Sequence, residues 1–143
     1  MFSPSQEQVR RFFCEAWSKH LASSPLVAIE VLAVDWMLEH PEYHADLSDV
    51  EAAVSAQYAV ESGRTNPFLH LSMHLSITEQ VSIDSPRGIK AAVARLAARR
   101  SSLHQAHHEA MEALGEMLWT AQRSGLAFDA EAYMARILSL ASR

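Results

Sequence analysis

The hydrophobic positions of this chain follow a helical repeat from one end to the other. Near the N-terminus, apolar residues occupy the i, i+3, i+4, i+7 and i+8 positions of one helix face, namely Val9, Phe12, Phe13, Ala16 and Trp17. No segment alternates apolar and polar residues with the two-residue period of a strand. The pattern therefore predicts an all-α fold.

Capping and turn residues divide the first half of the chain. Ser3 and Pro4 are suited to open the first helix, and Ser24 with Pro25 a second one. Pro41 ends that second helix, because the residue before a proline disfavours the helical conformation. Residues 40–65 are less regular, with one short helix expected after position 50. The buried face predicted for the second helix consists of Leu26, Ile29, Ala33, Trp36 and Met37.

In the second half, the pattern predicts a helix over 67–82 and a long helix over 86–124. The two are joined by the tight connection SIDSPRG, so we expect an antiparallel hairpin, with a bend of the long helix at Ser101-Ser102. Gly125 ends the long helix and Asp129 caps a last one. The whole is expected to be a compact bundle of about five to six helices, a single helical domain over residues 1–143.

Composition excludes several classes of protein. Hydrophobic residues make up 49% and charged residues 20%, as in globular proteins. A net charge of −5 argues against nucleic-acid binding, which needs a concentrated basic surface. No apolar run approaches the roughly 20 residues of a membrane span, and the N-terminus lacks the apolar core of a signal peptide. We therefore expect no membrane association and a cytoplasmic protein.

The single cysteine, Cys14, fits that compartment, because one thiol cannot form a disulfide within the chain. Its neighbours in the sequence are apolar, so we interpret Cys14 as a small packed hydrophobic residue.

Histidines carry the candidate chemistry. Eight occur, and three pairs are spaced by four residues: His40/His44, His70/His74 and His104/His108. Residues four apart on a helix share one face, with Cβ atoms about 6 Å apart. Two imidazoles so placed can bind one metal ion, as in helical zinc and iron sites.

Helical projection at about 100° per residue places His70 and His74 on an apolar arc with Ile77 and Val81. Glu79 is turned roughly 140° away from His74, so it is not expected to share a site with this pair. Both histidines are predicted to face the core.

The same projection puts His104, His107 and His108 on or beside the apolar face of the long helix. Glu112 lies at the edge of that face, whereas Glu109 points to the polar side. His104, His108 and Glu112 therefore form one row that offers two imidazoles and a carboxylate.

Buried histidines also have a purely structural interpretation, because a neutral imidazole can bond to a backbone carbonyl or a carboxylate in the core. Geometry also limits a shared site. In a straight hairpin His74 and His108 are about 18 Å out of level, at about 1.5 Å per residue. A site with all four paired residues therefore needs the bend. Without it, His70 pairs with His104, and His40 or His44 completes the site.

The predicted metal ligands are His70, His74, His104, His108, Glu112 and His44. Zinc is favoured if the ligands are mainly imidazole, and iron or manganese if carboxylates join. A ligand histidine also needs an acceptor for its second nitrogen. The candidate acceptors are Glu39, Glu42 and Glu112.

Two stretches, NPFLHLSMHLSITEQ (66–80) and EHPEYHADL (39–47), carry a resemblance. With FFCEAW, SIDSPRGI, AQRSG and the row that runs from His108 to Trp119, they make the chain similar, over its full length, to a family of small bacterial proteins described as a domain of unknown function. The resemblance implies a bacterial protein and no activity, substrate or cofactor. His107 is not among the hallmark positions of the family, so it ranks below His104 and His108.

Three hypotheses for function follow. The first is a metal-binding helical bundle, with the reaction unspecified. The alternative is a non-enzymatic interaction module that binds a partner protein or itself through an exposed apolar groove, with structurally buried histidines. Acid–base catalysis by His and Glu without metal ranks last, since no nucleophile–base pair and no Gly-rich phosphate loop is visible.

Overall fold

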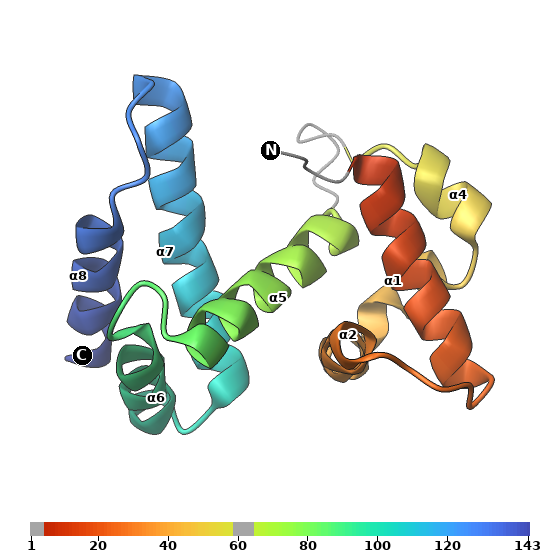
Figure 1. Cartoon of the computed structure of the whole chain (residues 1–143), viewed down its shortest axis with the longest axis horizontal. Coiled ribbons are helices and arrows are strands. Elements are labelled where there is room, and N and C mark those ends of the chain that lie inside the picture. Colours follow the sequence, from red (N-terminus) through yellow and green to blue (C-terminus); the bar gives the residue numbers. More distant parts are fainter. Residues whose placement is uncertain (1–4, 59–64) are drawn as a thin grey trace. The chain divides into compact units, whose positions relative to one another are not determined.

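A computed structural model describes residues 5–58 and 65–143, and the described residues contain helices and no strand (Figure 1). The all-α prediction is therefore confirmed. The helices are α1 (Gln6–Leu21), α2 (Ala28–Leu38), α3 (His44–Leu47), α4 (Val50–Ser55), α5 (Pro67–Ile83), α6 (Ile89–Arg100), α7 (Leu103–Ser124) and α8 (Ala130–Ala141), with a short 3-10 helix, η1 (Pro41–Tyr43), after α2.

Backbone contacts group the chain into two compact units, residues 1–75 and 76–143, and α5 contributes to both. The single helical domain expected over 1–143 stays a prediction. Within the described ranges, none of the helices combines the length and the apolar character that a membrane crossing requires.

The helix count exceeds the predicted five to six for two reasons. The irregular region after Pro41 contains two short helices, α3 and α4. The long helix expected over 86–124 is two helices, since Ser101 has a left-handed backbone (φ 53°) that no α-helix accommodates. Ser102 then caps α7 by accepting the N–H of Gln105 at 3.0 Å. The bend was thus predicted at the right place, but it is a complete break.

Helix ends elsewhere follow the capping rules. Ser5 caps α1 and forms a capping box with Gln8; the predicted contribution of Ser3 and Pro4 lies outside the described residues. Gly125 ends α7 with φ 73°, and the Asp129 carboxylate accepts the N–H of Ala132 at the start of α8. Both of these ends were predicted correctly.

α2 begins later than Ser24-Pro25, at Ala28, and a carboxylate further along the helix closes its start. Glu30 accepts the N–H of Val27 at 2.9 Å and the Nζ of Lys19 at 2.9 Å. The predicted buried face is partly wrong: Ala33 and Met37 are fully buried, whereas the side chain of Ile29 is 53% exposed. The residues of α2 that are buried are Glu30, Ala33, Val34 and Met37.

We expect the Glu30 contacts to make the stability of the protein depend on acidic pH. The pKa of Glu30 lies below its ordinary value of 4.5, first because Val27 N–H donates to the carboxylate and then because Lys19 does. A carboxylate whose pKa is lower in the folded than in the unfolded state stabilises the fold at pH values above the unfolded pKa. This contribution is lost as the pH falls through the folded pKa. Glu30→Gln should therefore lose less stability than the unsubstituted protein between neutral pH and pH values below 4.5.

Thermal unfolding followed by circular dichroism over that pH range measures the effect. Asp35→Asn is the matched control, since Asp35 is an exposed carboxylate on the same helix. Parallel pH curves for Glu30→Gln and the unsubstituted protein would contradict the prediction.

The N-terminal unit has a continuous apolar core. Phe13, Ala16 and Trp17 are buried as predicted for the face of α1, and Val9 and Phe12 pack against them. Cys14 is 4% exposed, which confirms its interpretation as a packed residue, and burial raises the pKa of its thiol to about 11. The other members of this core are Ala33, Val34, Met37, Tyr43, Leu47, Ala53, Phe68 and Leu71.

One charged side chain enters that core. Arg10 of α1 is only 6% exposed, and its Nη1 donates to the carbonyls of Ala53 at 2.9 Å and Ala56 at 2.7 Å. Its guanidinium also lies 5.4 Å from the ring centre of Tyr58 and 5.5 Å from that of Phe68. Arg10 thus holds the end of α4 against α1.

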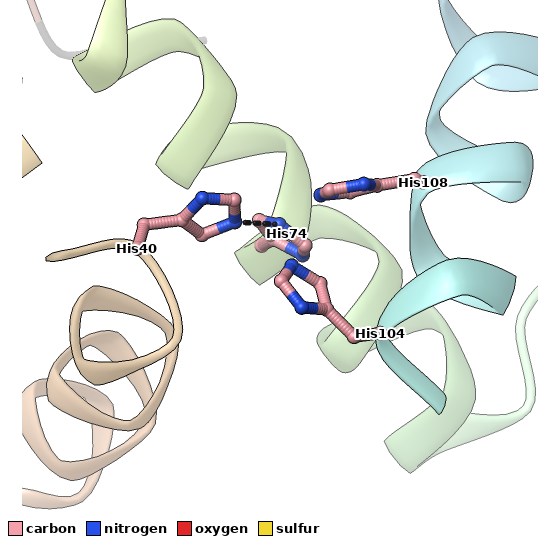
Figure 2. Close-up of side chains that lie close together, drawn as sticks. All are labelled: His40, His74, His104 and His108. Atoms are coloured by element: carbon pink, nitrogen blue, oxygen red, sulfur yellow. Dashed lines mark hydrogen bonds between the residues drawn. The ribbon is translucent and has the colours of Figure 1, made fainter. Parts of the chain in front are cut away.

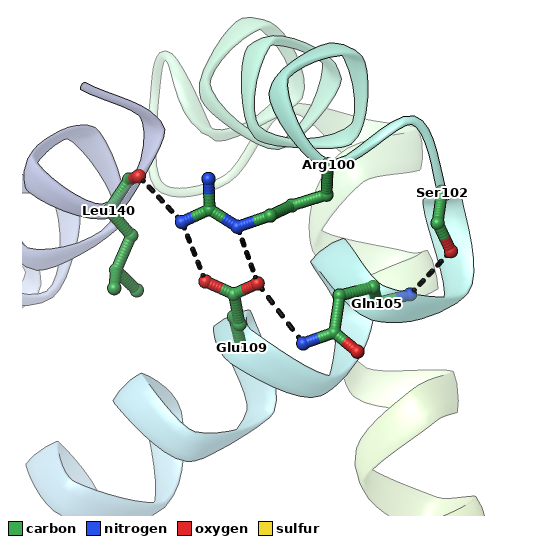
Figure 3. Close-up of polar contacts among 5 residues, drawn as sticks. All are labelled: Arg100, Ser102, Gln105, Glu109 and Leu140. Atoms are coloured by element: carbon green, nitrogen blue, oxygen red, sulfur yellow. Dashed lines mark hydrogen bonds and ion pairs between the residues drawn. The ribbon is translucent and has the colours of Figure 1, made fainter. Parts of the chain in front are cut away.

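In the C-terminal unit, α6, α7 and α8 pack together around small and branched residues, with Ile89, Leu96, Tyr133 and Ile137 fully buried. Arg100 at the end of α6 ties the three helices together (Figure 3). Its guanidinium forms two bonds with Glu109 of α7, at 2.8 and 3.0 Å, and donates to the carbonyl of Leu140 of α8 at 2.9 Å. Glu109, which was predicted to point to the polar side of its helix, therefore forms an ion pair with Arg100.

Candidate functional site

The imidazoles of His40 and His74, in the N-terminal unit, approach each other through their ring nitrogens. The Nε2 atoms of the two imidazoles are 3.0 Å apart, as the dashed line in Figure 2 marks. Both side chains are buried, at 4% and 0% exposure. The projection that turned His74 toward the core is thus confirmed, and the imidazole to which it bonds belongs to a residue 34 positions earlier.

Local backbone geometry explains why His40 reaches this place. His40 follows the end of α2 and has a non-helical backbone (φ −128°, ψ 65°), as expected before Pro41. The chain then turns through η1, and Tyr43 N–H donates to the carbonyl of His40 at 2.9 Å. His40 and His44 are therefore not on one continuous helix, and the shared face expected from their spacing does not form.

The second nitrogen of His40 is also engaged. Its Nδ1 lies 2.8 Å from Oε2 of Glu42, one of the three acceptors proposed from the sequence. The hydrogen bond with His40 lowers the pKa of the Glu42 carboxyl, which therefore stays ionised at neutral pH. The Glu42 side chain is 57% exposed, so its charge remains solvated.

Aromatic rings cover both imidazoles. Trp36 stacks on His74 with ring centres 4.0 Å apart and planes inclined by 15°. Tyr43 stacks on His40 at 5.0 Å and 13°, and burial raises the pKa of the Tyr43 phenol. These contacts fix the planes of the two rings and cover their faces.

His70, one turn before His74 on α5, lies beside the pair. Its ring centre is 4.6 Å from that of His40 and 4.9 Å from that of His74, in edge-to-face arrangements. The predicted proximity of His70 and His74 is confirmed, and the three rings of the N-terminal unit form one cluster.

His44 has a different environment. Its Nε2 bonds to the carbonyl of Met37 at 2.8 Å, and its ring stacks on Trp17 with centres 4.2 Å apart. This is the arrangement of a histidine whose polarity is satisfied by the backbone. Nε2 of His44 is therefore engaged by the backbone.

The C-terminal unit holds the second predicted pair, on α7. His104 and His108 are half-buried, and their ring centres are 4.4 Å apart. Glu112, one turn further along, is exposed. His107 is 4% exposed, and its pKa is lowered to about 4, first by burial and then by the neighbouring His104 and His108. His107 is thus neutral at physiological pH.

Each unit therefore presents a pair of imidazoles, His40/His74 in one and His104/His108 in the other. Two neutral imidazoles suit borderline transition-metal ions rather than Mg²⁺ or Ca²⁺, which prefer oxygen ligands. Sequence reasoning named His40 only as an alternative to His44 for completing a site, and not as the partner of His74. Spacing could not reveal that partner, although Pro41 directly after it was a sign that His40 leaves the helix.

Comparison with known proteins identifies a family for this chain but no activity. One family model matches residues 5–139, and its description is a domain of unknown function. No curated protein and no solved structure matches the chain.

Proposed function

We propose that this chain, which belongs to the DUF1841 family, is a metal-binding helical protein that uses inward-facing histidines. The observation that carries the proposal is the 3.0 Å approach of the Nε2 atoms of His40 and His74 in a buried, aromatic-lined position. Buried histidines more often bond to carbonyls or carboxylates than to each other, so two converging imidazole nitrogens are an unusual arrangement for a purely structural role.

Metal geometry supports this assignment. Zinc–nitrogen bonds of about 2.0–2.1 Å with a tetrahedral angle place two ligand nitrogens about 3.3 Å apart. The Nε2 atoms of His40 and His74 are 3.0 Å apart, so moving them apart by a few tenths of an ångström gives the separation of two ligands on one tetrahedral ion.

Two imidazoles alone are too few ligands for a stable site, since structural zinc takes four and catalytic zinc three. We propose His104 and His108, the other pair predicted from the sequence, as the remaining ligands, so that four imidazoles hold one ion. Zinc is the first candidate for an all-imidazole set, and iron becomes favoured if the Glu112 carboxylate joins. His70 stays a candidate because of its contact with the first pair, while His44 and Glu112 stay predictions of the sequence.

The test is elemental analysis of the purified protein, followed by titration of metal-free protein with Zn²⁺, Fe²⁺ and Co²⁺. A shared site predicts one ion per chain, and Co²⁺ should give the absorption of a four-coordinate complex. Two ions per chain would show that each pair binds its own metal. Absence of binding by all three ions would overturn the proposal.

One observation supports a second candidate, an interaction module. α2 is apolar on its outer side as well as its inner side, which is unusual for a helix at a protein surface. The large apolar side chains of α2 and of its N-cap residue with exposures of 41–62% are Val27, Ile29, Val31, Leu32 and Leu38. We propose a second copy of the chain as the occupant, because an apolar face matches another face of the same kind.

Sedimentation velocity tests this second candidate. The unsubstituted protein should dimerise at micromolar concentration, and Leu32→Glu should be monomeric. A monomer at every concentration would exclude self-association through α2. Dimerisation that persists in metal-free protein would separate this role from the metal site.

A further inference from the structure

We infer that Glu42 is a positioning residue for the metal site. Its carboxylate holds His40 in the Nδ1–H tautomer, in which the unprotonated Nε2 faces the ion. The inference rests on the proposed function, because it assigns Glu42 a role toward a ligand of the proposed metal. The contact that carries it is the 2.8 Å distance between Glu42 Oε2 and His40 Nδ1.

The chemistry of the two groups determines the position of the proton. An ionised carboxylate only accepts hydrogen bonds, so Nδ1 of His40 must donate. A neutral imidazole has a single N–H, and its other nitrogen then carries a lone pair that can accept a hydrogen bond or bind a metal ion. In His40 that nitrogen is Nε2, which lies 3.0 Å from Nε2 of His74. Glu42 therefore makes Nε2 of His40 the ligand atom before any ion arrives.

The fold keeps Glu42 in this role. The η1 turn, with Pro41 at its first position, places His40 and Glu42 on the same short loop. Tyr43 stacks on the imidazole ring and fixes its plane, so that Nδ1 stays directed at the carboxylate. Because Glu42 is about half exposed, its ionised form is retained at little desolvation cost. Carboxylate, histidine and metal then form the triad that raises ligand basicity in many metal sites.

Three variants test separately the hydrogen-bond acceptor at position 42 and its negative charge. Glu42→Ala removes both, Glu42→Gln keeps a neutral acceptor, and Asp35→Asn removes a charge from an exposed position of α2 as the control. Two readouts are needed. The ¹⁵N chemical shifts of His40 in metal-free protein report its tautomer, and competition with a chelator reports affinity for Zn²⁺.

We expect His40 to be in the Nδ1–H tautomer in the unsubstituted protein and in Asp35→Asn, and to lose this preference in Glu42→Ala. Zinc affinity should fall by about 10- to 100-fold in Glu42→Ala, by less in Glu42→Gln, and not at all in Asp35→Asn. The far-UV circular dichroism of all three should match, which separates positioning from folding.

The possible failures are distinguishable. If the unsubstituted protein binds zinc and Glu42→Ala binds it equally well, Glu42 has no positioning role while the proposed function stands. If His40 keeps its tautomer in Glu42→Ala, the inference is also overturned. If no metal binds to any form, the proposed function fails, and the inference fails with it.

Discussion

The His40→Ala, His74→Ala double variant is expected to purify without metal and to bind zinc at least about 10⁴-fold more weakly than the unsubstituted protein. Four-ligand zinc sites bind with about 10–16 kcal/mol, so each ligand contributes roughly 3 kcal/mol, or a factor of about 100. Removing the pair whose Nε2 atoms are 3.0 Å apart takes away two of the four proposed ligands.

Elemental analysis and chelator competition measure this loss. His20→Ala is the matched control, because His20 belongs to the same unit and its ring contacts Trp17 instead of the pair. His74→Gln provides a second variant that keeps a polar side chain at a fully buried position, in case alanine leaves a cavity that unfolds the unit. Metal retained in stoichiometric amount by the folded double variant would exclude His40 and His74 as ligands.

The two histidines of this pair differ in how well a sequence reveals them. His74 lies within a regular helix, where an advance of about 100° per residue places it among Ile77 and Val81. His40 lies where Pro41 ends α2, and its side-chain direction depends on a turn that periodicity does not describe. The spacing of His40 and His44 resembled a helical pair, yet His44 bonds to the carbonyl of Met37 instead.

The same limit applied to the fold. Amphipathic periodicity predicted the buried face of α1, which has a clear polar side. The extent of α5 followed instead from Pro67 at its start and the SIDSPRG connection at its end. α2 has apolar residues all round, so the pattern could not separate the buried Val34 from the exposed Ile29. The break at Ser101 depends on a single left-handed residue, which is a matter of backbone conformation rather than of hydrophobic spacing.

Arg10 is the residue whose role was least visible in the sequence. Arg10 and Arg11 are adjacent and chemically identical, and both flank the predicted apolar face. Arg10 is buried because its acceptors, the carbonyls of Ala53 and Ala56, lie more than 40 positions away. Arg11 instead pairs with Glu7 near the surface. Long-range backbone acceptors of this kind leave no periodic signal.

Arg10→Met should therefore lower the free energy of unfolding of the N-terminal unit by about 4 kcal/mol. Hydrogen bonds from a charged donor contribute about 2 kcal/mol each, and this substitution removes two. Methionine fills much of the same volume, so the loss reflects the carbonyls left without their donor rather than a cavity. The contacts of the guanidinium with the rings of Tyr58 and Phe68 disappear as well.

Urea denaturation followed by tryptophan fluorescence measures this change in a Trp119→Phe background. That replacement leaves Trp17 and Trp36, both in the N-terminal unit, as the only tryptophans of the chain. Arg11→Met is the matched control and should change the stability little, because exposed ion pairs contribute little. If the two arginine variants unfold at the same urea concentration, the carbonyl contacts of Arg10 do not stabilise the fold. A selective loss in Arg10→Met would instead show that one buried cation holds α4 against α1.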